Sequence, residues 1–394
     1  MTITGRQTFA VMIAASFAST IGGLPFNSLP ILLGSLADSF GLSPQQTGFL
    51  GSACFTGYFG GTLAAFFMIN HVSWRRLTAL AAGFASIALL LSSIADWQFQ
   101  MLLWAVLGFF AALMTCLGLR IMGEMDNKER ALGLRQGIEL GVTALVLFIL
   151  PTYVTATYGY EGTAITLLLI VLGLSLSAFL LPERSRAIDA APGLLQQIRL
   201  PGKAWFALIV FLIFGAGNIG LWAFLERMGN SLELEPAELG TVFAVLKLLG
   251  GAAAFVIAMI GDRVGMRLPY LMVLFVIVVG LLLLWQADGF IVFALGAWVW
   301  EVGFTWGCVY MTATVARLDS QGRAIMLIPA AFAVSSMVGP AAAGFLSVES
   351  FVPLLSFALI STLIAVVVFS GVLARTVLQV GPVPVGIAPV ADVT

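Results

Sequence analysis

Long apolar runs alternate with short polar segments along the whole chain. A helix needs about 20 apolar residues to cross the hydrocarbon core of a bilayer, and twelve runs come close to or exceed this length. They cover roughly residues 9–34, 46–69, 77–95, 98–122, 134–156, 162–182, 204–226, 237–260, 268–286, 290–314, 324–346 and 351–374. The pattern predicts an all-α polytopic membrane protein with twelve transmembrane helices.

The longest polar stretch, residues 183–203, separates the sixth run from the seventh and contains Pro192, Pro201 and four basic residues. This composition is typical of a linker. The predicted organisation is an N-terminal six-helix bundle over residues 1–182, a cytoplasmic linker over 183–203, a C-terminal six-helix bundle over 204–374 and a cytoplasmic tail over 375–394.

The two halves are similar to each other. A shift of 192 residues aligns Leu42 with Leu234, Pro44 with Pro236, Gly48 with Gly240, Val72 with Val264 and Arg75 with Arg267. The aligned residues occupy the same places relative to the apolar runs. We therefore predict a parallel repeat of two pseudo-symmetric six-helix units, a pattern found in one large class of transporters.

Basic residues gather in alternate gaps between the runs. Sixteen of the eighteen lysines and arginines lie in the amino-terminal segment, in or within three residues of every second gap, or after the last run, and the exceptions are Arg227 and Lys247. Excess Lys and Arg in short loops marks the cytoplasmic face. We expect a multi-pass protein of a bacterial inner membrane with both termini in the cytoplasm.

The remaining composition argues against catalysis and nucleic-acid binding. Only 9% of the residues are charged and the net charge is −1, which gives no basic surface for nucleic acid. His71 is the single histidine, and the three cysteines lie inside apolar runs without metal-ligand spacing. No nucleotide-binding loop is present. We expect no enzyme activity, no metal and no cofactor.

A loop motif follows the eighth run. The segment GDRVGMR, residues 261–267, resembles the cytoplasmic loop signature of the major facilitator superfamily, G-x-x-x-D-R-x-G-R-[RK]. The matching residues are Asp262, Arg263, Gly265 and Arg267. The first-half copy, NHVSWRR, keeps only the basic pair Arg75–Arg76. The segment KERALGL, residues 128–134, is similar to the loop between the fourth and fifth spans of that superfamily.

This resemblance implies a central cavity lined by spans one, four, seven and ten, and a cytoplasmic gate at Asp262, Arg263 and Arg267. Spans one and seven contain helix-breaking sequences, GGLPFNSLP around Asn27 and GAGNIG around Asn218. Interrupted helices at corresponding places in two halves indicate a transport site. The resemblance places Asn27, Asn218 and Glu301 on the central cavity.

Two ionic residues lie near the middle of apolar runs, Lys247 in the eighth and Glu301 in the tenth. Charge in hydrocarbon is costly and usually faces a cavity or a partner. One interpretation is an ion pair that neutralises both. The other is a site at which Lys247 binds an anionic substrate and Glu301 binds a proton.

Four further ionic residues lie nearer the ends of the runs. Glu139 and Arg120 are at the same predicted depth on spans five and four, and they are expected to form a structural or gate pair, although a role for Glu139 in substrate or proton binding stays open. Glu226 and Arg227 are at the outer end of span seven, where either a solvated mouth or an outer gate accounts for them.

Span ten is rich in aromatic residues: Trp298, Trp300, Phe304, Trp306 and Tyr310. Trp300 and Phe304 share a helix face beside Glu301. Trp and Tyr favour membrane interfaces, which accounts for some of these rings, but a deep ring can also stack on an aromatic or amphipathic substrate. We include Trp300, Phe304 and Trp222 of span seven among the candidate substrate-binding residues.

The expected function is secondary active transport of a small organic solute, anionic or amphipathic, by alternating access and with proton-coupled uptake. The protein's partners are then this solute and the lipid bilayer, the proton gradient is its energy source, and it acts as a monomer. The alternatives are a proton-antiport exporter of amphipathic compounds, an uncoupled facilitator and, in a different class, a non-transporting membrane sensor.

Overall fold

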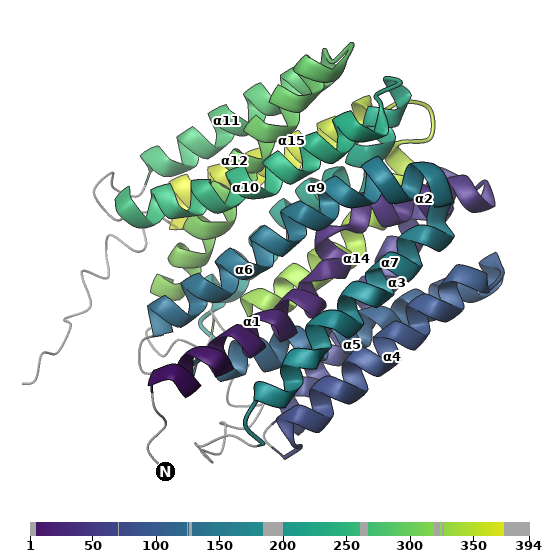
Figure 1. The fold of residues 1–394 in the computed structure, drawn as a ribbon. Coiled ribbons are helices and arrows are strands. Elements are labelled where there is room, and N and C mark those ends of the chain that lie inside the picture. Colours follow the sequence, from purple (N-terminus) through teal and green to yellow (C-terminus); the bar gives the residue numbers. More distant parts are fainter. Residues whose placement is uncertain are drawn as a thin grey trace, which may run out of the picture.

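A computed structural model describes residues 5–69, 71–123, 125, 128–183, 200–260, 267–318, 324 and 327–373. These residues are almost entirely helical, and none of them lies in a strand. The predicted all-α fold is confirmed. Figure 1 shows the long helices of both halves side by side along a common direction.

The described residues of the N-terminal half form seven α-helices, one short π-helix and one short 3₁₀-helix. They are α1 (Gly5–Asn27), α2 (Leu29–Phe40), α3 (Pro44–Met68), α4 (Trp74–Ile94), α5 (Trp97–Gly123), α6 (Lys128–Ile149), the π-helical η1 (Leu150–Thr155), α7 (Ala156–Ser175) and the 3₁₀-helical η2 (Leu176–Leu180).

The described elements of the C-terminal half are α9 (Gly202–Ser231), α10 (Pro236–Ile260), α11 (Leu268–Trp285), α12 (Phe290–Leu318), α14 (Ile328–Leu346), α15 (Val352–Val367) and the π-helical η4 (Val368–Leu373). The interruption predicted around Asn218 is wrong, because GAGNIG lies inside the continuous helix α9. Its glycines instead allow close packing, since a Cβ atom on Gly217 would overlap Oγ of Ser361 and one on Gly220 would lie 2.7 Å from the carbonyl oxygen of Gly339.

Ten helical stretches in the described part of the chain are long and apolar enough to cross a membrane. One of them, Ala131–Leu180, is 50 residues long and covers the predicted fifth and sixth spans. The second span, α3, is not among the ten because its glycines, threonines and glutamines make it less apolar. Because Ala131–Leu180 contains two spans, the ten stretches account for eleven spans, and α3 is the twelfth.

The interruption predicted in the first span is confirmed, since this span consists of two helices. Ser28 separates α1 from α2, between Pro25 inside α1 and Pro30 in the first turn of α2. A proline supplies no backbone N–H and so interrupts the hydrogen bonding of a helix. Gly41, with φ of +62°, ends α2 in the left-handed conformation that glycine adopts without strain.

Two predicted loops differ from the structure. Residues 128–134 were expected in a loop, but α6 begins at Lys128, because Lys, Glu, Arg, Ala and Leu are all good helix formers. The connection between the fifth and sixth spans is only a kink, at which Gly159 has φ of +59° within α7. The π turn η1 therefore leads almost directly into the sixth span.

Each half packs its first span closely against its fifth, at glycines 192 residues apart. A Cβ atom on Gly23 of α1 would lie 2.5 Å from Oε1 of Glu139 on α6. A Cβ atom on Gly215 of α9 would lie 2.5 Å from Oγ of Ser335 on α14. The predicted pseudo-symmetry therefore extends to individual side-chain contacts.

We call the end of the molecule that carries the connections 41–43, 95–96, 232–235, 286–289 and 347–351 the outer end, after the charge pattern. Near this end, glycines bring the halves together. A Cβ atom on Gly344 of α14 would lie 2.5 Å from the carbonyl oxygen of Pro44, and one on Gly240 of α10 would lie 2.7 Å from Oγ1 of Thr152. The halves meet mainly through α3 with α14, α6 with α10, and α2 with α9.

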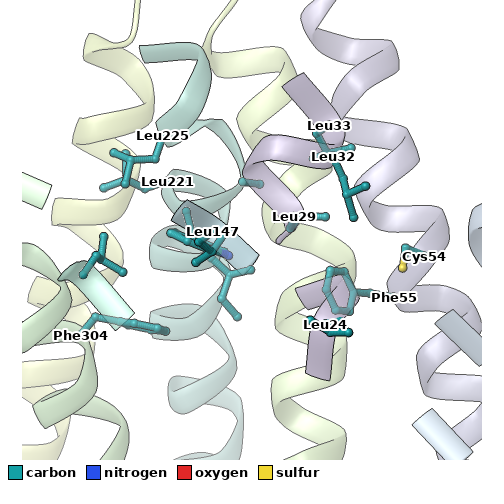
Figure 2. Packing of buried hydrophobic residues seen from close by; sticks show 14 of the residues in the cluster. Leu24, Leu29, Leu32, Leu33, Cys54, Phe55, Leu147, Leu221, Leu225 and Phe304 are labelled. Atoms are coloured by element: carbon teal, nitrogen blue, oxygen red, sulfur yellow. The ribbon is translucent and has the colours of Figure 1, made fainter. Parts of the chain in front are cut away.

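Apolar side chains fill the space between these helices. Figure 2 shows Leu24 of α1 beside Phe55 of α3, with Leu32 and Leu33 of α2 above them. Leu24, Leu32, Leu33 and Phe55 are all buried. The broken first span is thus held on both sides of its break by the apolar core.

Candidate functional site

Lys247 lies in the middle of α10 and is only 6% exposed. Its Nζ atom is 3.9 Å from the centre of the Trp222 ring on α9 and 5.7 Å from the centre of the Phe26 ring on α1. An ammonium over an aromatic face is attracted by the ring quadrupole, more strongly where water is excluded. Lys247 therefore reaches from the C-terminal half to the break in the first span.

Glu301 lies on α12, is also 6% exposed, and packs against Gly250. A Cβ atom on Gly250 would lie 2.6 Å from Oε1 of Glu301. Gly250 follows Lys247 by three residues on α10, and residues three apart share a helix face. The glycine therefore lets the carboxylate approach α10 close to the lysine.

Of the two interpretations of Lys247 and Glu301, the direct ion pair is not found among the described residues. In that part of the chain, neither Lys247 Nζ nor the Glu301 carboxylate has an ion pair or a hydrogen bond. A buried charge without a direct partner is costly. Lys247 is therefore suited to bind an anionic group, and Glu301 to bind a proton or a cationic group.

Glu139 belongs to a polar cluster between α1 and α6. Arg135 Nη1 lies 2.6 Å from Glu139 Oε2, Ser19 donates a 3.3 Å hydrogen bond to the same oxygen, and Asn27 Nδ2 lies 3.5 Å from Oε1. The carboxylate thus pairs with Arg135, which lies one turn earlier on the same helix. The predicted partner was Arg120, and that prediction is wrong. The i,i+4 spacing holds Arg135 and Glu139 together without a second helix.

Asn218 and Trp300 form a hydrogen-bonded group inside the C-terminal half. Trp300 Nε1 donates to Asn218 Oδ1 at 2.9 Å, and Asn218 Nδ2 donates to the Phe214 carbonyl at 2.9 Å and to Thr362 at 3.2 Å. Trp300 and Asn218 have no exposed surface. Phe304, 8% exposed, stacks on Trp300 with ring centres 5.7 Å apart. Phe304 is therefore the more accessible of the two rings.

Glu226 and Arg227 connect α9 to α2 at the outer end. Arg227 Nη1 lies 2.6 Å from Asp38 Oδ1, and Nη2 donates to the Gly34 carbonyl. Glu226 is buried against Gly34 and accepts a 2.7 Å hydrogen bond from Asn230. Glu226 and Arg227 thus join the two halves of the molecule at its outer end.

Two other predicted gate residues, Arg120 and Arg267, lie toward the opposite end. Arg120 is half-buried in the last turn of α5, and Arg267 is exposed at the start of α11. Asp262 and Arg263 fall outside the residues that the structure describes.

Comparisons with known proteins agree with this architecture. The family model of the Major Facilitator Superfamily matches residues 9–320. The chain belongs to the major facilitator superfamily. No curated protein sequence matches the chain.

Similar solved structures cover nearly all of the chain. A D-xylose–proton symporter has a TM-score of 0.72 at 14% identity, over 91% of this chain and 97% of that one. A nucleoside transporter, NupG, has a TM-score of 0.70 at 12% identity, over 95% and 98%. A bacterial homologue of the human lysosomal transporter Spinster has a TM-score of 0.68 at 13% identity, over 97% and 100%. These identities show a common fold alone, and superfamily membership indicates a transporter rather than an enzyme.

In this member of the superfamily, several site residues escaped sequence analysis. Phe26, Gly250, Arg135, Ser19 and Asp38 all contact predicted site residues. Arg135 could have been found, because it lies four residues before Glu139 on a predicted helix. The others carry no local signal, since helices distant in the sequence bring them to the site.

Proposed function

We propose that this protein is a secondary active transporter that takes up a small organic anion together with a proton, by alternating access of its two halves to a central site. Lys247 is the observation that carries the proposal. It is a buried ammonium without an ion pair among the described residues, held on the face of Trp222. A carboxylate or similar anion of the substrate is the natural partner for it.

The rings around Lys247 favour a substrate with an apolar or aromatic part. Phe26 packs edge-on against Phe55 and Phe332, with ring centres 5.8 and 5.2 Å away. The Trp222 ring centre lies 3.9 Å from Lys247 Nζ. Aromatic side chains stack on the apolar part of a ligand, and a few polar groups of the site fix the orientation of that ligand. We therefore propose an amphipathic organic acid rather than a small inorganic anion.

The balance of charge supports proton coupling. Two basic residues, Arg135 and Lys247, balance two acidic residues, Glu139 and Glu301, in formal charge. A bound monoanion leaves the site with a net negative charge in a region of low dielectric constant, which is costly. A proton on Glu301 removes that charge. Glu301 is the proposed proton site, since Glu139 already has Arg135 as its partner.

Several wider statements belong to the same proposal. The charge pattern supports a bacterial inner membrane with both termini in the cytoplasm, and the apolar helices support the lipid bilayer as surroundings. The protein is proposed to act as a monomer, with the proton gradient as its energy source and without a cofactor. Asn27, Phe304 and Trp222 are proposed to contact the substrate, while Arg120, Arg227, Asp262, Arg263 and Arg267 are proposed gate residues.

A thermal-shift screen tests the substrate class. Purified protein is heated with organic acids, sugars, nucleosides and cationic drugs. Organic acids should raise the melting temperature of the wild type and of the control Lys203→Met, an exposed lysine at the start of α9. They should not stabilise Lys247→Met. Stabilisation by cationic drugs, unchanged in Lys247→Met, would instead favour the alternative of an exporter of amphipathic compounds.

Proteoliposomes then test coupling. With the stabilising acid from the screen, an inward proton gradient should drive accumulation by the wild type and by the control Glu235→Gln, an exposed residue before α10. Glu301→Gln should lose accumulation and keep counterflow exchange. Equal accumulation by Glu301→Gln would remove the proton role of this residue, and gradient-independent uptake by the wild type would identify a facilitator.

A further inference from the structure

The break in the first span leaves one backbone carbonyl without its helical donor. In an α-helix the N–H of each residue bonds to the carbonyl four residues earlier. The donor for the Phe26 carbonyl would be residue 30, but this residue is a proline and has no N–H. The Phe26 carbonyl is therefore free to accept a hydrogen bond from outside its own helix.

Trp222 supplies that hydrogen bond from the other half. Its Nε1 atom donates to the Phe26 carbonyl at 3.0 Å, and the side chain is only 1% exposed. Two other tryptophans of the C-terminal half make a similar bond within that half. Trp298 Nε1 donates to the Val242 carbonyl at 2.9 Å, and Trp306 Nε1 to the Ala253 carbonyl at 3.1 Å.

The Trp222 ring is held by further contacts. Phe243 of α10 packs edge-on against it, with ring centres 5.8 Å apart, and Lys247 lies over its face. Trp222 precedes Glu226 by four residues, so both lie on one face of α9. From the inside outwards, α9 contacts the first span at the Phe26 carbonyl through Trp222, at Gly34 through Glu226 and at Asp38 through the neighbouring Arg227. The Trp222–Phe26 hydrogen bond is thus the innermost of a series that ends at the outer surface.

We propose that the Trp222–Phe26 hydrogen bond holds the outer end closed above the central site, and that Pro30 is required because it frees the carbonyl for this bond. Trp222 is then a positioning residue for alternating access, with its N–H joined to one half and its ring against the proposed substrate lysine of the other. The inference rests on the alternating access in the proposed function, but not on the substrate or the proton.

The test measures how often the outer end opens. Cys54, Cys116 and Cys308 are replaced with alanine, and Ala37→Cys is added on α2, where the native side chain is 6% exposed beside Arg227. The rate of labelling by a maleimide reagent is measured on protein in nanodiscs without substrate or gradient. Trp222→Phe keeps a ring over Lys247 and loses only the N–H donor.

Trp222→Phe should label about 2- to 10-fold faster, the change expected from losing one hydrogen bond between uncharged groups. Trp298→Phe and Trp306→Phe are matched controls that lose an indole bond within one half, and they should label at the background rate. Pro30→Ala restores a helical donor for the Phe26 carbonyl and should also label faster. The double variant Pro30→Ala/Trp222→Phe should label no faster than the faster single variant, because both substitutions remove the same hydrogen bond.

Labelling of Trp222→Phe at the rate of Trp298→Phe would overturn the proposal. The proposal would also be overturned if the labelling rate of the double variant rose by the product of the two single increases, because Pro30 and Trp222 would then act independently. Pro30→Ala leaves Trp222 unaltered, so it tests the same bond even where Trp222→Phe does not fold. Neither labelling result depends on transport. A negative result would therefore not affect the proposed anion and proton sites, which the thermal-shift and proteoliposome experiments test separately.

Discussion

The indole N–H of Trp300 donates to Oδ1 of Asn218 at 2.9 Å, and neither side chain has any surface exposed. Sequence analysis placed both at the substrate site, yet their hydrogen bonds are satisfied inside the C-terminal half. Buried polar groups that satisfy one another specify packing and are costly to separate. Their direct contribution in the structure is therefore to position α9 against α12.

Asn218→Ala should destabilise the protein by about 1–3 kcal/mol, because it leaves the Trp300 N–H buried without an acceptor. Thermal unfolding in detergent measures the loss. Trp300→Phe should cost less in the Asn218→Ala background than in the wild type, and Trp285→Phe, at a ring that is 59% exposed, is the control. Equal costs in both backgrounds would show that the two residues act independently.

Gly34→Ala should weaken the outer closure. A Cβ atom at position 34 would overlap the Glu226 carboxylate, and the neighbouring Gly34 carbonyl accepts from Arg227. The expected result is faster labelling of a reporter cysteine at position 37 and a lower melting temperature. The control is Gly83→Ala, since nothing lies within 4 Å of a Cβ atom there, and it should stabilise α4 by up to about 1 kcal/mol. Identical behaviour of the two variants would contradict the contact.

The ion pair of Arg227 with Asp38 should contribute little by itself. The Asp38 side chain is 63% exposed, and exposed pairs contribute about 0.2–1 kcal/mol. In a double-mutant cycle of Asp38→Asn and Arg227→Ala, the coupling in melting experiments should fall in this range and decrease with added salt. Arg227→Ala should cost more than Asp38→Asn, because it also loses the bond to the Gly34 carbonyl. A larger loss in Asp38→Asn would show that the carboxylate has another role.

Arg135→Gln should destabilise the protein by about 1–3 kcal/mol, because the Glu139 side chain, 13% exposed, then lacks its cation. Adding Glu139→Gln should restore part of the stability, since it removes the unpaired charge. Thermal unfolding compares the single and double variants with Arg76→Gln, an exposed arginine on α4. Lower stability in the double variant than in Arg135→Gln would indicate that Glu139 is stabilised without Arg135.

Most of the fold was predictable because hydrocarbon imposes strong and local requirements. The runs that became α9, α11 and α12 were predicted within a few residues of their observed bounds, since only a long apolar helix satisfies its backbone in lipid. The predicted ends of the spans were wrong where the local tendency to form a helix or a turn outweighs the polarity of the residues. Lys128 begins α6 although it is charged, and Gly159 turns the chain with a single residue.

The candidate site was less predictable. Depth along a helix identified Lys247 and Glu301 as exceptional, and the structure keeps both buried. Depth does not specify the direction in which a side chain points, so an ion pair was one natural interpretation. The observed partners of Lys247 are the rings of Trp222 and Phe26.

The sequence by itself determined the number of membrane-crossing helices, the repeat of two halves and the two ions in the middle of apolar runs, because each depends on composition and spacing along one segment. Only the tertiary structure decided that Trp222 bonds to the carbonyl of Phe26, 196 residues away, and that Glu139 pairs with Arg135 instead of Arg120. The rotation of each helix about its axis sets these contacts, and that rotation follows from the packing of all the helices together.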